Sequence, residues 1–591
     1  MSWFWRTKPR SIVKTLQWFP SFAALEGKNW NTRSQNVNTF NQKNIYPIRR
    51  SYIFSAHAED DSWLSTISYE EYLSGKMDQK ETESNGRNDK TTFEFFGFGY
   101  VEKEGTIKIT EVGRRIVQGS FDQDNYIKQL LKLHFPNPVQ KIKSNITNPR
   151  VFPMEIVIKA FQHFESLNRS ELALLFGCDC KEKEAAMISA IGAFKTSYSE
   201  LQNKQDTKKI RALFTTIYES YYGPMENKVE SYYDYAEAFS RSLIYTGLFS
   251  TSGRSIATKL RVAKHAQKKF ELLSRSYTFH APEQFHSRSD YMEWYGSSSN
   301  IELPWERKEE HSELVQEKIH LLQELLSNQK TFGHTQQSFD SQTDLDLLFA
   351  QTGNTDNLSL FELKDLEKSI DAAITNHNEH YFIHVLSKTP SEQKAILDKF
   401  DDILANDDMS ALWLEVNTWK SLIAIPGNHK VKRNFQIEED LSPKSFAPGV
   451  GNTPDMELYL GNTILLPEVS LMTGVRQWEH EASSVIDHVF HFIEKHPEKQ
   501  VLGLFLSSRI HVRTLWQFFL LNRESWLGKP IPVVPMTIVQ YQTLLKHCYE
   551  KRRTMPELIQ FLLSLSKSTA RIKQFQDWET HIERKIHQFI Q

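Results

Sequence analysis

Three acidic residues in the C-terminal third stand where a buried segment is normally apolar. Asp455 precedes the apolar run 456–460, Glu468 lies inside the run 463–471, and Glu481 follows on the next segment. An unpaired carboxylate is costly to bury. Carboxylate oxygens are ligands that Mg²⁺ prefers, and a bound Mg²⁺ can polarise a phosphate, activate water and stabilise the leaving oxygen. The pattern therefore predicts a Mg²⁺ site that hydrolyses a phosphodiester bond.

A β-hairpin would bring two of these acids together. The two apolar runs are separated by Gly461 and Asn462, which form a two-residue turn of the kind that joins antiparallel strands. Strand ends face each other in such a hairpin, so Asp455 and Glu468 are expected to lie side by side. The backbone carbonyl of Val469 is expected to be a further oxygen ligand of the metal.

Two predicted helices supply the other polar groups. The helix over 410–425 carries Glu415 among apolar neighbours, where it could complete the metal shell. On the helix over 475–493, Glu481 could hold a second metal or orient water, and His488 could donate to phosphate; a histidine satisfied inside the fold is the alternative for His488. One polar stripe at helical spacing is expected along this helix, formed by Gln477, Glu481, Ser484 and His488.

The order of these residues resembles the PD-(D/E)XK nuclease superfamily. That superfamily has a helix glutamate, a Pro-Asp hairpin and then a glutamate two residues before a lysine. Here Ser470 stands at the position where lysine is usual. The apolar strand pattern at 500–508 and the strand-then-helix pattern at 530–545 complete the prediction of a mixed α/β core.

The N-terminal half repeats one layout. Residues 95–117 contain two short strand-like runs around a charged turn, followed by a helix that begins at Thr110 with a capping side chain. Hairpin followed by helix is the layout of the C-terminal half of a winged-helix module, and an ordinary hairpin packed on a helix is the alternative. The polar stretch 74–90, just before it, is expected to be an exposed loop.

A second copy of the layout follows. Residues 153–177 show the pattern of a helix-turn-helix, with a new helix capped by Asn168 or Ser170. Residues 243–273 again show a strand, a glycine turn, a strand and a basic helix. Two copies in one half favour the winged-helix interpretation over a single chance resemblance.

Basic residues gather in this second copy, as phosphate contacts to DNA would require. A solvated helix face is the alternative, and the formal net charge of −2 gives no overall electrostatic signature. The expected DNA-binding residues are Arg169, Arg254, Lys259, Arg261 and Lys264.

The length of the chain and its pattern indicate several domains. A chain of 591 residues is too long for one hydrophobic core. We expect a mainly α N-terminal half, a helical linker with interleaved charges, and a C-terminal α/β domain. The expected division is a winged-helix-like DNA recognition subdomain at 1–150, a second one at 151–285, the helical linker at 286–400 and a PD-(D/E)XK-like cleavage domain at 401–591.

Composition excludes several classes of protein. The three cysteines cannot form a disulfide framework, which fits a reducing cytoplasm. No apolar run reaches about 18 residues and no signal-peptide pattern is present, so no membrane partner is expected. No glycine-rich loop occurs at a strand-to-helix junction, so ATP-driven chemistry is not supported.

With these residues in hand, the chain resembles the AlwI-type family of type IIS restriction endonucleases, which includes the GAGTC-recognising nicking endonucleases. The resemblance implies winged-helix-like recognition subdomains, a helical linker and a cleavage domain in which lysine is normally missing. It also implies that Glu415, Asp455, Glu468 and Glu481 are the acidic active-site residues. The motifs that carry it, in order, are 97–117, 245–249, 415–428, 451–460, 467–470 and 477–481.

The resemblance implies a Mg²⁺-dependent, site-specific deoxyribonuclease that binds a short asymmetric site in double-stranded DNA and cuts at a fixed offset. One active site hydrolyses one strand, so we expect a nicking enzyme, a large subunit that works with a small nuclease subunit, or a transient homodimer. Host protection would need a cognate methyltransferase as a separate protein. The alternatives are a sequence-specific DNA-binding protein with an inactive nuclease-like domain and a repair-type nuclease.

Overall fold

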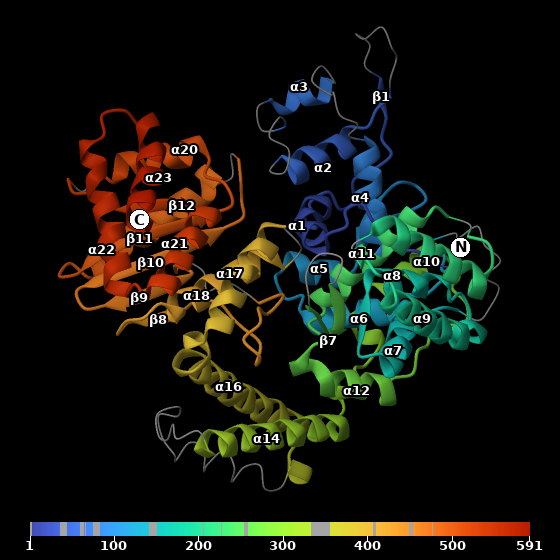
Figure 1. Ribbon diagram of the computed structural model, residues 1–591. Coiled ribbons are helices and arrows are strands. Elements are labelled where there is room, and N and C mark those ends of the chain that lie inside the picture. The colour runs from blue at the N-terminus through green and yellow to red at the C-terminus, as the bar shows by residue number, and fades with distance from the viewer. Residues whose placement is uncertain are drawn as a thin grey trace. The chain divides into compact units, whose positions relative to one another are not determined.

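The computed structural model shows a multidomain, mostly helical protein with a mixed sheet in its C-terminal part (Figure 1). Two units can be separated: unit 1 is Met1–Thr331 with Ser341–Ile370, and unit 2 is Phe332–Asp340 with Asp371–Gln591. The expected four-part division stays a prediction. The structure describes residues 3–35, 44–58, 64, 67–74, 83–140, 150–204, 206–225, 227–252, 258–331, 355–405, 409–447, 453–474, 477–526 and 528–591.

The first part of unit 1 contains the predicted hairpin followed by a helix. Strands β3 and β4 pair antiparallel, and the Thr110 hydroxyl caps the next helix by accepting a hydrogen bond from the Gly113 N–H at 3.2 Å. The elements are α1 (Ile12–Ala23), β1 (Ser34–Gln35), β2 (Asn44–Ile45), α2 (Pro47–His57), α3 (Tyr69–Ser74), α4 (Glu83–Phe95), β3 (Gly99–Val101), β4 (Ile107–Ile109), α5 (Glu111–Val117) and α6 (Gln123–Lys132).

The expected loop at 74–90 was wrong over its second half, since α4 begins at Glu83. The helix turns a polar residue inward: Asp89 is buried, accepts a hydrogen bond from the Tyr52 hydroxyl at 3.0 Å, and lies 2.8 Å from His57 Nε2. Polar composition indicated solvent, but partners on α2 satisfy this carboxylate. Residues 75–82 lie outside the described part of the chain.

The second part of unit 1 contains the predicted helix-turn-helix and its hairpin. Asn168, one of the two expected caps, accepts a hydrogen bond from the Glu171 N–H, and the Glu171 side chain accepts one from the Asn168 N–H. Strand β7 pairs antiparallel with both β5 and β6, so the sheet order is β5-β7-β6. The elements are α7 (Pro153–His163), β5 (Ser166–Asn168), α8 (Arg169–Leu174), α9 (Glu184–Ser199), α10 (Thr207–Tyr222), α11 (Val229–Tyr245), β6 (Phe249–Ser252), β7 (Lys259–Val262) and α12 (Gln267–Ser276).

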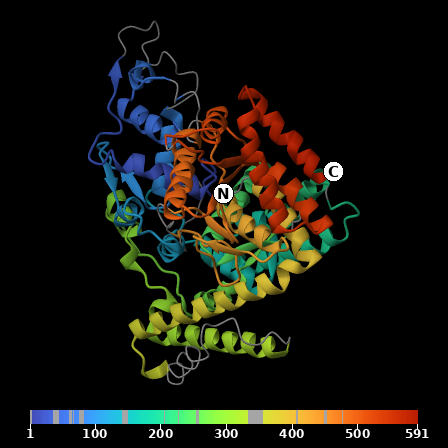
Figure 2. The same cartoon turned by 90° about the vertical axis from the view of Figure 1, so that its left-hand side faces the viewer.

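The region 286–400 is mainly helical where the structure describes it. Helix α14 and the N-terminal part of α16 lie side by side (Figures 1 and 2). An ion-pair cluster joins them, because Lys318 Nζ lies 3.0 Å and His311 Nε2 lies 3.2 Å from the Glu367 carboxylate. The helices are α13 (Arg288–Tyr295), α14 (Lys308–Thr331), α16 (Leu360–His384) and α17 (Pro390–Leu404).

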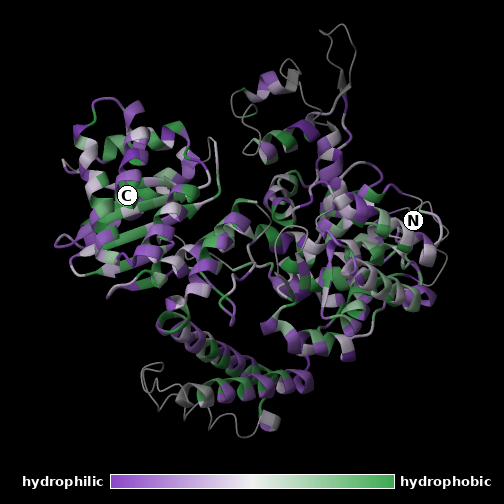
Figure 3. Ribbon diagram, viewed as in Figure 1, coloured by the Kyte–Doolittle hydropathy of each residue, from purple (hydrophilic) through white to green (hydrophobic). Residues whose placement is uncertain are grey.

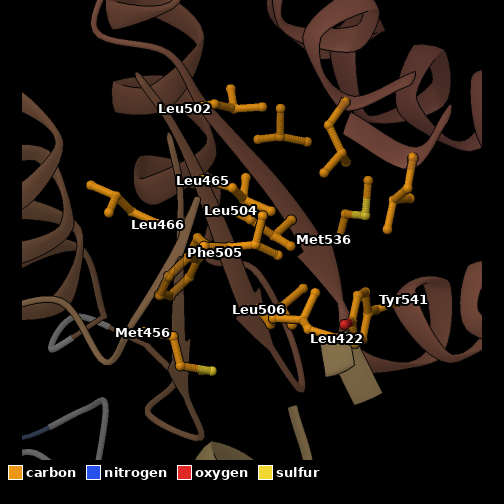
Figure 4. Close-up of a cluster of buried hydrophobic side chains, with 14 of the residues drawn as sticks. Leu422, Met456, Leu465, Leu466, Leu502, Leu504, Phe505, Leu506, Met536 and Tyr541 are labelled. Carbon is orange, nitrogen blue, oxygen red and sulfur yellow. The ribbon is translucent and has the colours of Figure 1, made fainter. Parts of the chain in front are cut away.

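Unit 2 is built on a five-stranded mixed sheet with the order β12-β11-β10-β9-β8. Strand β10 pairs antiparallel with β9 and parallel with β11, and β12 is parallel to β11. Strands β9 to β12 are mostly hydrophobic (Figure 3), whereas β8 is mostly charged. Leucines of β10 and β11 meet Met536 and Tyr541 in the core (Figure 4). The elements are α18 (Ser410–Ala424), β8 (Lys430–Arg433), β9 (Met456–Leu460), β10 (Thr463–Ser470), α19 (Ala482–Lys495), β11 (Gln500–Ser507), α20 (Val512–Leu521), β12 (Val533–Thr537), α21 (Ile538–Lys551), α22 (Met555–Ser568) and α23 (Gln576–Ile590).

Helix α19 lies unusually close to β11. A side chain at Gly503 would place its Cβ 2.8 Å from Cγ2 of Val489, so glycine is what permits this approach. The helix buries a face on which Val485, Val489 and Phe492 recur at helical spacing. This packing fixes the helix that carries His488. Within the described residues, no helix combines the length and apolar character needed to cross a bilayer.

Candidate active site

The predicted hairpin places Asp455 and Glu468 side by side. Leu460 pairs with Thr463 across the turn, so the residue that precedes β9 lies opposite Glu468 on β10. The Asp455 N–H lies 3.4 Å from Oε2 of Glu468, and the Val469 N–H donates to Oδ2 of Asp455 at 2.8 Å. The turn residues therefore set the position of both acids, as the sequence predicted.

His488, on α19, contacts Glu468 of this pair. Its Nδ1 lies 2.6 Å from Oε1 of Glu468, within hydrogen-bonding distance, and the histidine is buried. Burial lowers the pKa of the imidazole, and the nearby acids Asp455 and Glu481 oppose that shift. The histidine thus contacts an acidic residue of the site and holds one of its oxygens.

The acids of the site share one electrostatic environment. Burial raises the pKa of Glu468 to about 8, with help from the charges of Glu481 and Glu415. Burial raises the pKa of Glu415 on α18 to about 8 as well, with help from Asp455 and Glu481. The pKa of Asp455 lies well above its usual range because of burial and then the charge of Glu468. The fold therefore gathers four acids whose ionised forms disfavour one another.

Glu481 is reached by an irregular turn. Gln477–Glu481 form a π-helix and α19 starts at Ala482. The prediction of one continuous polar stripe was wrong, because Gln477 is buried while Ser484 is exposed. A π turn holds one more residue than an α turn and so changes the register that regular helical spacing assumes. Residues 475 and 476 of the predicted helix lie outside the described part.

The chemistry of the donor set fits a hard divalent cation. Glu415, Asp455 and Glu468 have raised pKa values, and the negative charge of Glu481 contributes to each. Mg²⁺ takes carboxylate and carbonyl oxygen ligands of the kind that these acids and Val469 offer. Among the residues that the structure describes, no three His, Cys, Asp or Glu side chains converge on one point as a metal-binding group. Side-chain rotations of Glu415, Asp455 or Glu468 would therefore accompany binding of a cation.

Sequence reasoning missed the residue that fixes the Pro-Asp turn. The Asn434 N–H donates to the Asp455 carbonyl at 2.9 Å, and its side-chain amide donates to the Pro454 carbonyl at 2.8 Å and to Glu457 at 2.9 Å. Lys432 also contacts Glu457, at 2.7 Å. An asparagine after a strand is ordinary in sequence, and nothing in the spacing connects Asn434 to a turn 20 residues later.

The expected DNA-binding residues of unit 1 have different surroundings. Lys259 and Lys264 are exposed on β7 and just after it, and Arg261 on the same strand is partly buried. Arg169 is held by Glu237 at 2.6 Å and donates to the Tyr233 carbonyl at 3.2 Å. The remaining expected residue, Arg254, lies outside the described residues.

The chain is similar to restriction endonucleases. Residues 95–544 match the family model described as AlwI restriction endonuclease, which covers most of the chain. Among solved structures, the small subunit of the heterodimeric restriction endonuclease R.BspD6I is 20% identical, with 32% of this chain and 98% of that chain covered and a TM-score of 0.28. A TM-score this low does not establish a shared fold. Comparison with curated proteins gave no match.

Proposed function

Because the chain belongs to the AlwI restriction endonuclease family, we propose that it binds a short asymmetric site in double-stranded DNA and hydrolyses a phosphodiester bond at a fixed offset. The family is one of site-specific nucleases that act on DNA. The observation that carries the proposal is the contact of Asp455 with the buried Glu468 on the central strand β10, with Glu415 and Glu481 close enough to share its electrostatic environment. The reaction is proposed to depend on Mg²⁺.

Each acidic residue has a proposed role. Asp455, Glu468 and Glu415, with the carbonyl of Val469, would hold Mg²⁺, which supplies charge stabilisation for the phosphate and activation of water. Glu481 orients the attacking water or extends the metal shell.

His488 acts on Glu468. Its Nδ1 contact turns one carboxylate oxygen of Glu468 toward the helix and fixes the other side of the group toward Asp455. The second ring nitrogen of His488 is left for the scissile phosphate or for water. His488 is thus proposed to be part of the catalytic set, with Asp455, Glu468, Glu481 and Glu415.

The recognition function is proposed for unit 1. The order α7, β5, α8, α9 and then the β6–β7 hairpin, with β5 paired to β7, supports a winged-helix-like subdomain. The hairpin would be the wing, and Lys259, Arg261 and Lys264 would contact phosphates from it. Arg169 would support this surface from α8, and Arg254 is proposed on sequence alone. The mixed sheet of unit 2 supports a PD-(D/E)XK-like cleavage domain.

One set of acids hydrolyses one strand. The chain is therefore proposed to nick an isolated duplex, and to cut both strands only with a small nuclease subunit or a second copy of itself. The proposed division stays at 150, 285 and 400, and the cognate methyltransferase would be a separate protein.

The test is incubation of the purified chain with supercoiled plasmid and Mg²⁺, followed by run-off sequencing of the ends. Ends at one distance from a short asymmetric sequence are expected, with open circles as the main product. Asp455→Ala should abolish cleavage and keep site-specific binding. Intact plasmid with specific binding would point instead to a catalytically silent DNA-binding protein, and ends without a shared sequence would point to a repair-type nuclease.

A further inference from the structure

Gln477, the first residue of the π-helix, is fully buried and has every polar atom of its side chain in use. Its amide nitrogen donates within a ring of three acceptors, and its amide oxygen accepts from the backbone. The contacts are Nε2 to the Met472 carbonyl at 2.8 Å, to the Ser507 hydroxyl at 3.0 Å and to the Arg509 carbonyl at 2.7 Å, and the His511 N–H to Oε1 at 2.6 Å.

These contacts join three segments that carry or flank the acidic site. Met472 lies two residues beyond β10, the strand of Glu468. Ser507 ends β11, and His511 is the N-cap of α20. The π-helix that starts at Gln477 ends at Glu481. A single side chain therefore ties the segment of Glu481 to the end of the strand that carries Glu468.

Because the turn from Gln477 to Glu481 is a π-helix, the contacts of Gln477 determine where Glu481 lies. Relaxation of the π turn into an α turn would shift the register by one residue, which moves a side chain by about 100° around the helix axis and about 1.5 Å along it. Displacements near 1 Å at reacting groups cost about 100-fold in rate. Glu481 is the last residue of the turn, so its place depends on the register that Gln477 fixes.

We propose that Gln477 is a positioning residue that holds Glu481 in register with Glu468, and this inference rests on the proposed function. Gln477 touches neither DNA nor the acids in this role; it acts through the π-helix. The competing explanation is a buried amide that merely stabilises the fold, and the chain offers a matched residue to separate the two.

Asn522 is that matched residue. It is also buried, and its amide nitrogen donates to the Phe518 carbonyl at 2.8 Å and the Val533 carbonyl at 2.6 Å, while its oxygen accepts from the Ser566 hydroxyl at 2.5 Å. Its contacts join the C-terminal end of α20 to β12 and α22, so it shares only α20 with the contacts of Gln477, which meet that helix at its N-terminal end. An Asn522 variant should therefore lose buried side-chain hydrogen bonds without moving Glu481.

The experiment compares Gln477→Met with Asn522→Leu in the full chain, since both changes keep most of the volume and remove the hydrogen bonds. Single-turnover nicking of supercoiled plasmid with Mg²⁺ is measured below the melting temperature of both variants, together with the Kd for the plasmid-derived duplex. We expect Gln477→Met to lower the rate constant about 100-fold with Kd within twofold, and Asn522→Leu to keep the rate constant within threefold.

A milder variant covers the case in which Gln477→Met does not fold. Ser507→Ala removes one of the four contacts of Gln477 and should lower the rate constant by about 3- to 10-fold with unchanged Kd. Equal rate losses in the Gln477 and Asn522 variants, or a normal rate in Gln477→Met, would overturn the proposal.

Hydrogen exchange separates this proposal from the proposed function. In the Gln477 or Ser507 variant, amides of 477–481 and of His511 should exchange faster while the β11 and β12 amides keep their protection. Unchanged exchange at 477–481 overturns the positioning role whatever the cleavage result. Failure of the wild-type chain to cut any plasmid would instead overturn the proposed function, and the exchange comparison would still decide the role of Gln477.

Discussion

Two glutamates that are mostly shielded from solvent, Glu367 in unit 1 and Glu468 in unit 2, have opposite electrostatic surroundings. Glu367 in unit 1 lies between Lys318 and His311, and although burial opposes ionisation, these partners hold the pKa of its carboxyl well below the usual range. Glu468 in unit 2 has a hydrogen-bonding partner in His488 but no lysine or arginine partner among the described residues, and burial together with the charges of Glu481 and Glu415 raises its pKa to about 8. The negative charge of Glu367 is therefore balanced by cationic side chains of the protein, whereas that of Glu468 is not.

The difference supports the proposal that Glu367 has a structural role and Glu468 a catalytic one. A buried ion pair with near neighbours on two helices serves to fix those helices, and breaking it is destabilising. Acids that raise one another's pKa have no such structural value, and clusters of this kind occur where function demands them. The comparison therefore predicts that charge removal lowers stability in unit 1 and lowers activity in unit 2.

The largest effect is expected for Glu468→Gln. The change keeps shape but removes a charge proposed to hold Mg²⁺, so the cleavage rate constant should fall at least 1,000-fold, about 4 kcal/mol in the barrier. The melting temperature without Mg²⁺ should stay level or rise at neutral pH, because the wild-type carboxyl, with its pKa raised to about 8, must take up a proton on folding and glutamine need not. Plasmid nicking and thermal unfolding measure the two outcomes.

Glu457→Gln is the control for that experiment. Glu457 lies on β9, the strand that directly follows Asp455, but it is paired with Lys432 at 2.7 Å and receives a hydrogen bond from Asn434. Its loss should lower stability by about 1–2 kcal/mol and leave the rate constant within about tenfold. A Glu468→Gln variant that cuts at the wild-type rate would remove Glu468 from the site.

Glu367→Gln should have the opposite signature. It leaves Lys318 and His311 buried without their acid, which costs about 3 kcal/mol of unfolding free energy in unit 1. Denaturant unfolding measures the loss, and nicking at a temperature where the variant is folded should be unchanged. If Glu367→Gln lost cleavage activity without losing stability, the proposed difference between Glu367 and Glu468 would be wrong.

The pH dependence of the Glu367 contribution has a definite sign. Since the pKa of Glu367 is lowered in the folded state, its contribution to stability is complete above the unfolded pKa, near 4.3, and is lost as pH falls toward the folded value. The gap in unfolding free energy between wild type and Glu367→Gln should therefore be constant from pH 7 to about 5 and shrink below it. A gap that widens in acid would contradict this sign.

Mg²⁺ should stabilise unit 2 alone. A cation that binds only the folded protein at 10 to 100 times its Kd adds about 1–3 kcal/mol to the unfolding free energy. Thermal unfolding with and without Mg²⁺ measures this gain for the wild-type chain. The matched variant is Asp455→Asn, for which the gain should disappear; an equal gain in both proteins would place the cation elsewhere.

Local patterns in the sequence were sufficient to predict the hairpin. The turn at Gly461-Asn462 fixes the register, and register alone places Asp455 opposite Glu468. The cap at Asn168 was predictable for the same reason, because its partner Glu171 is three residues away. The assignment of catalytic roles to these acids stays a prediction.

Contacts between distant residues explain what could not be predicted. The π turn is fixed by Gln477 through partners 30 and 34 residues away, and helical spacing gives no sign of them. The first part of α4 was predicted to be a loop because its residues are polar. The partners that satisfy Asp89 inside the fold, Tyr52 and His57, lie 37 and 32 residues earlier and leave no local signal. A polar residue in sequence looks solvated until its partner is known.

The smallest effects are expected at the proposed DNA surface of unit 1, where exposed and paired cations differ. Lys259 and Lys264 are exposed, whereas Lys268 contacts Glu271 and Glu313 at 3.2 and 2.8 Å. Each of Lys259→Ala and Lys264→Ala should weaken DNA binding by less than about 1 kcal/mol and reduce the slope of log K against log salt by about 1. Lys268→Ala should leave the slope unchanged, because a lysine already neutralised by two glutamates releases no counterion from DNA. Titrations over a range of salt concentrations measure these slopes, and equal slopes for the three variants would mean that exposure does not mark the phosphate contacts of this unit.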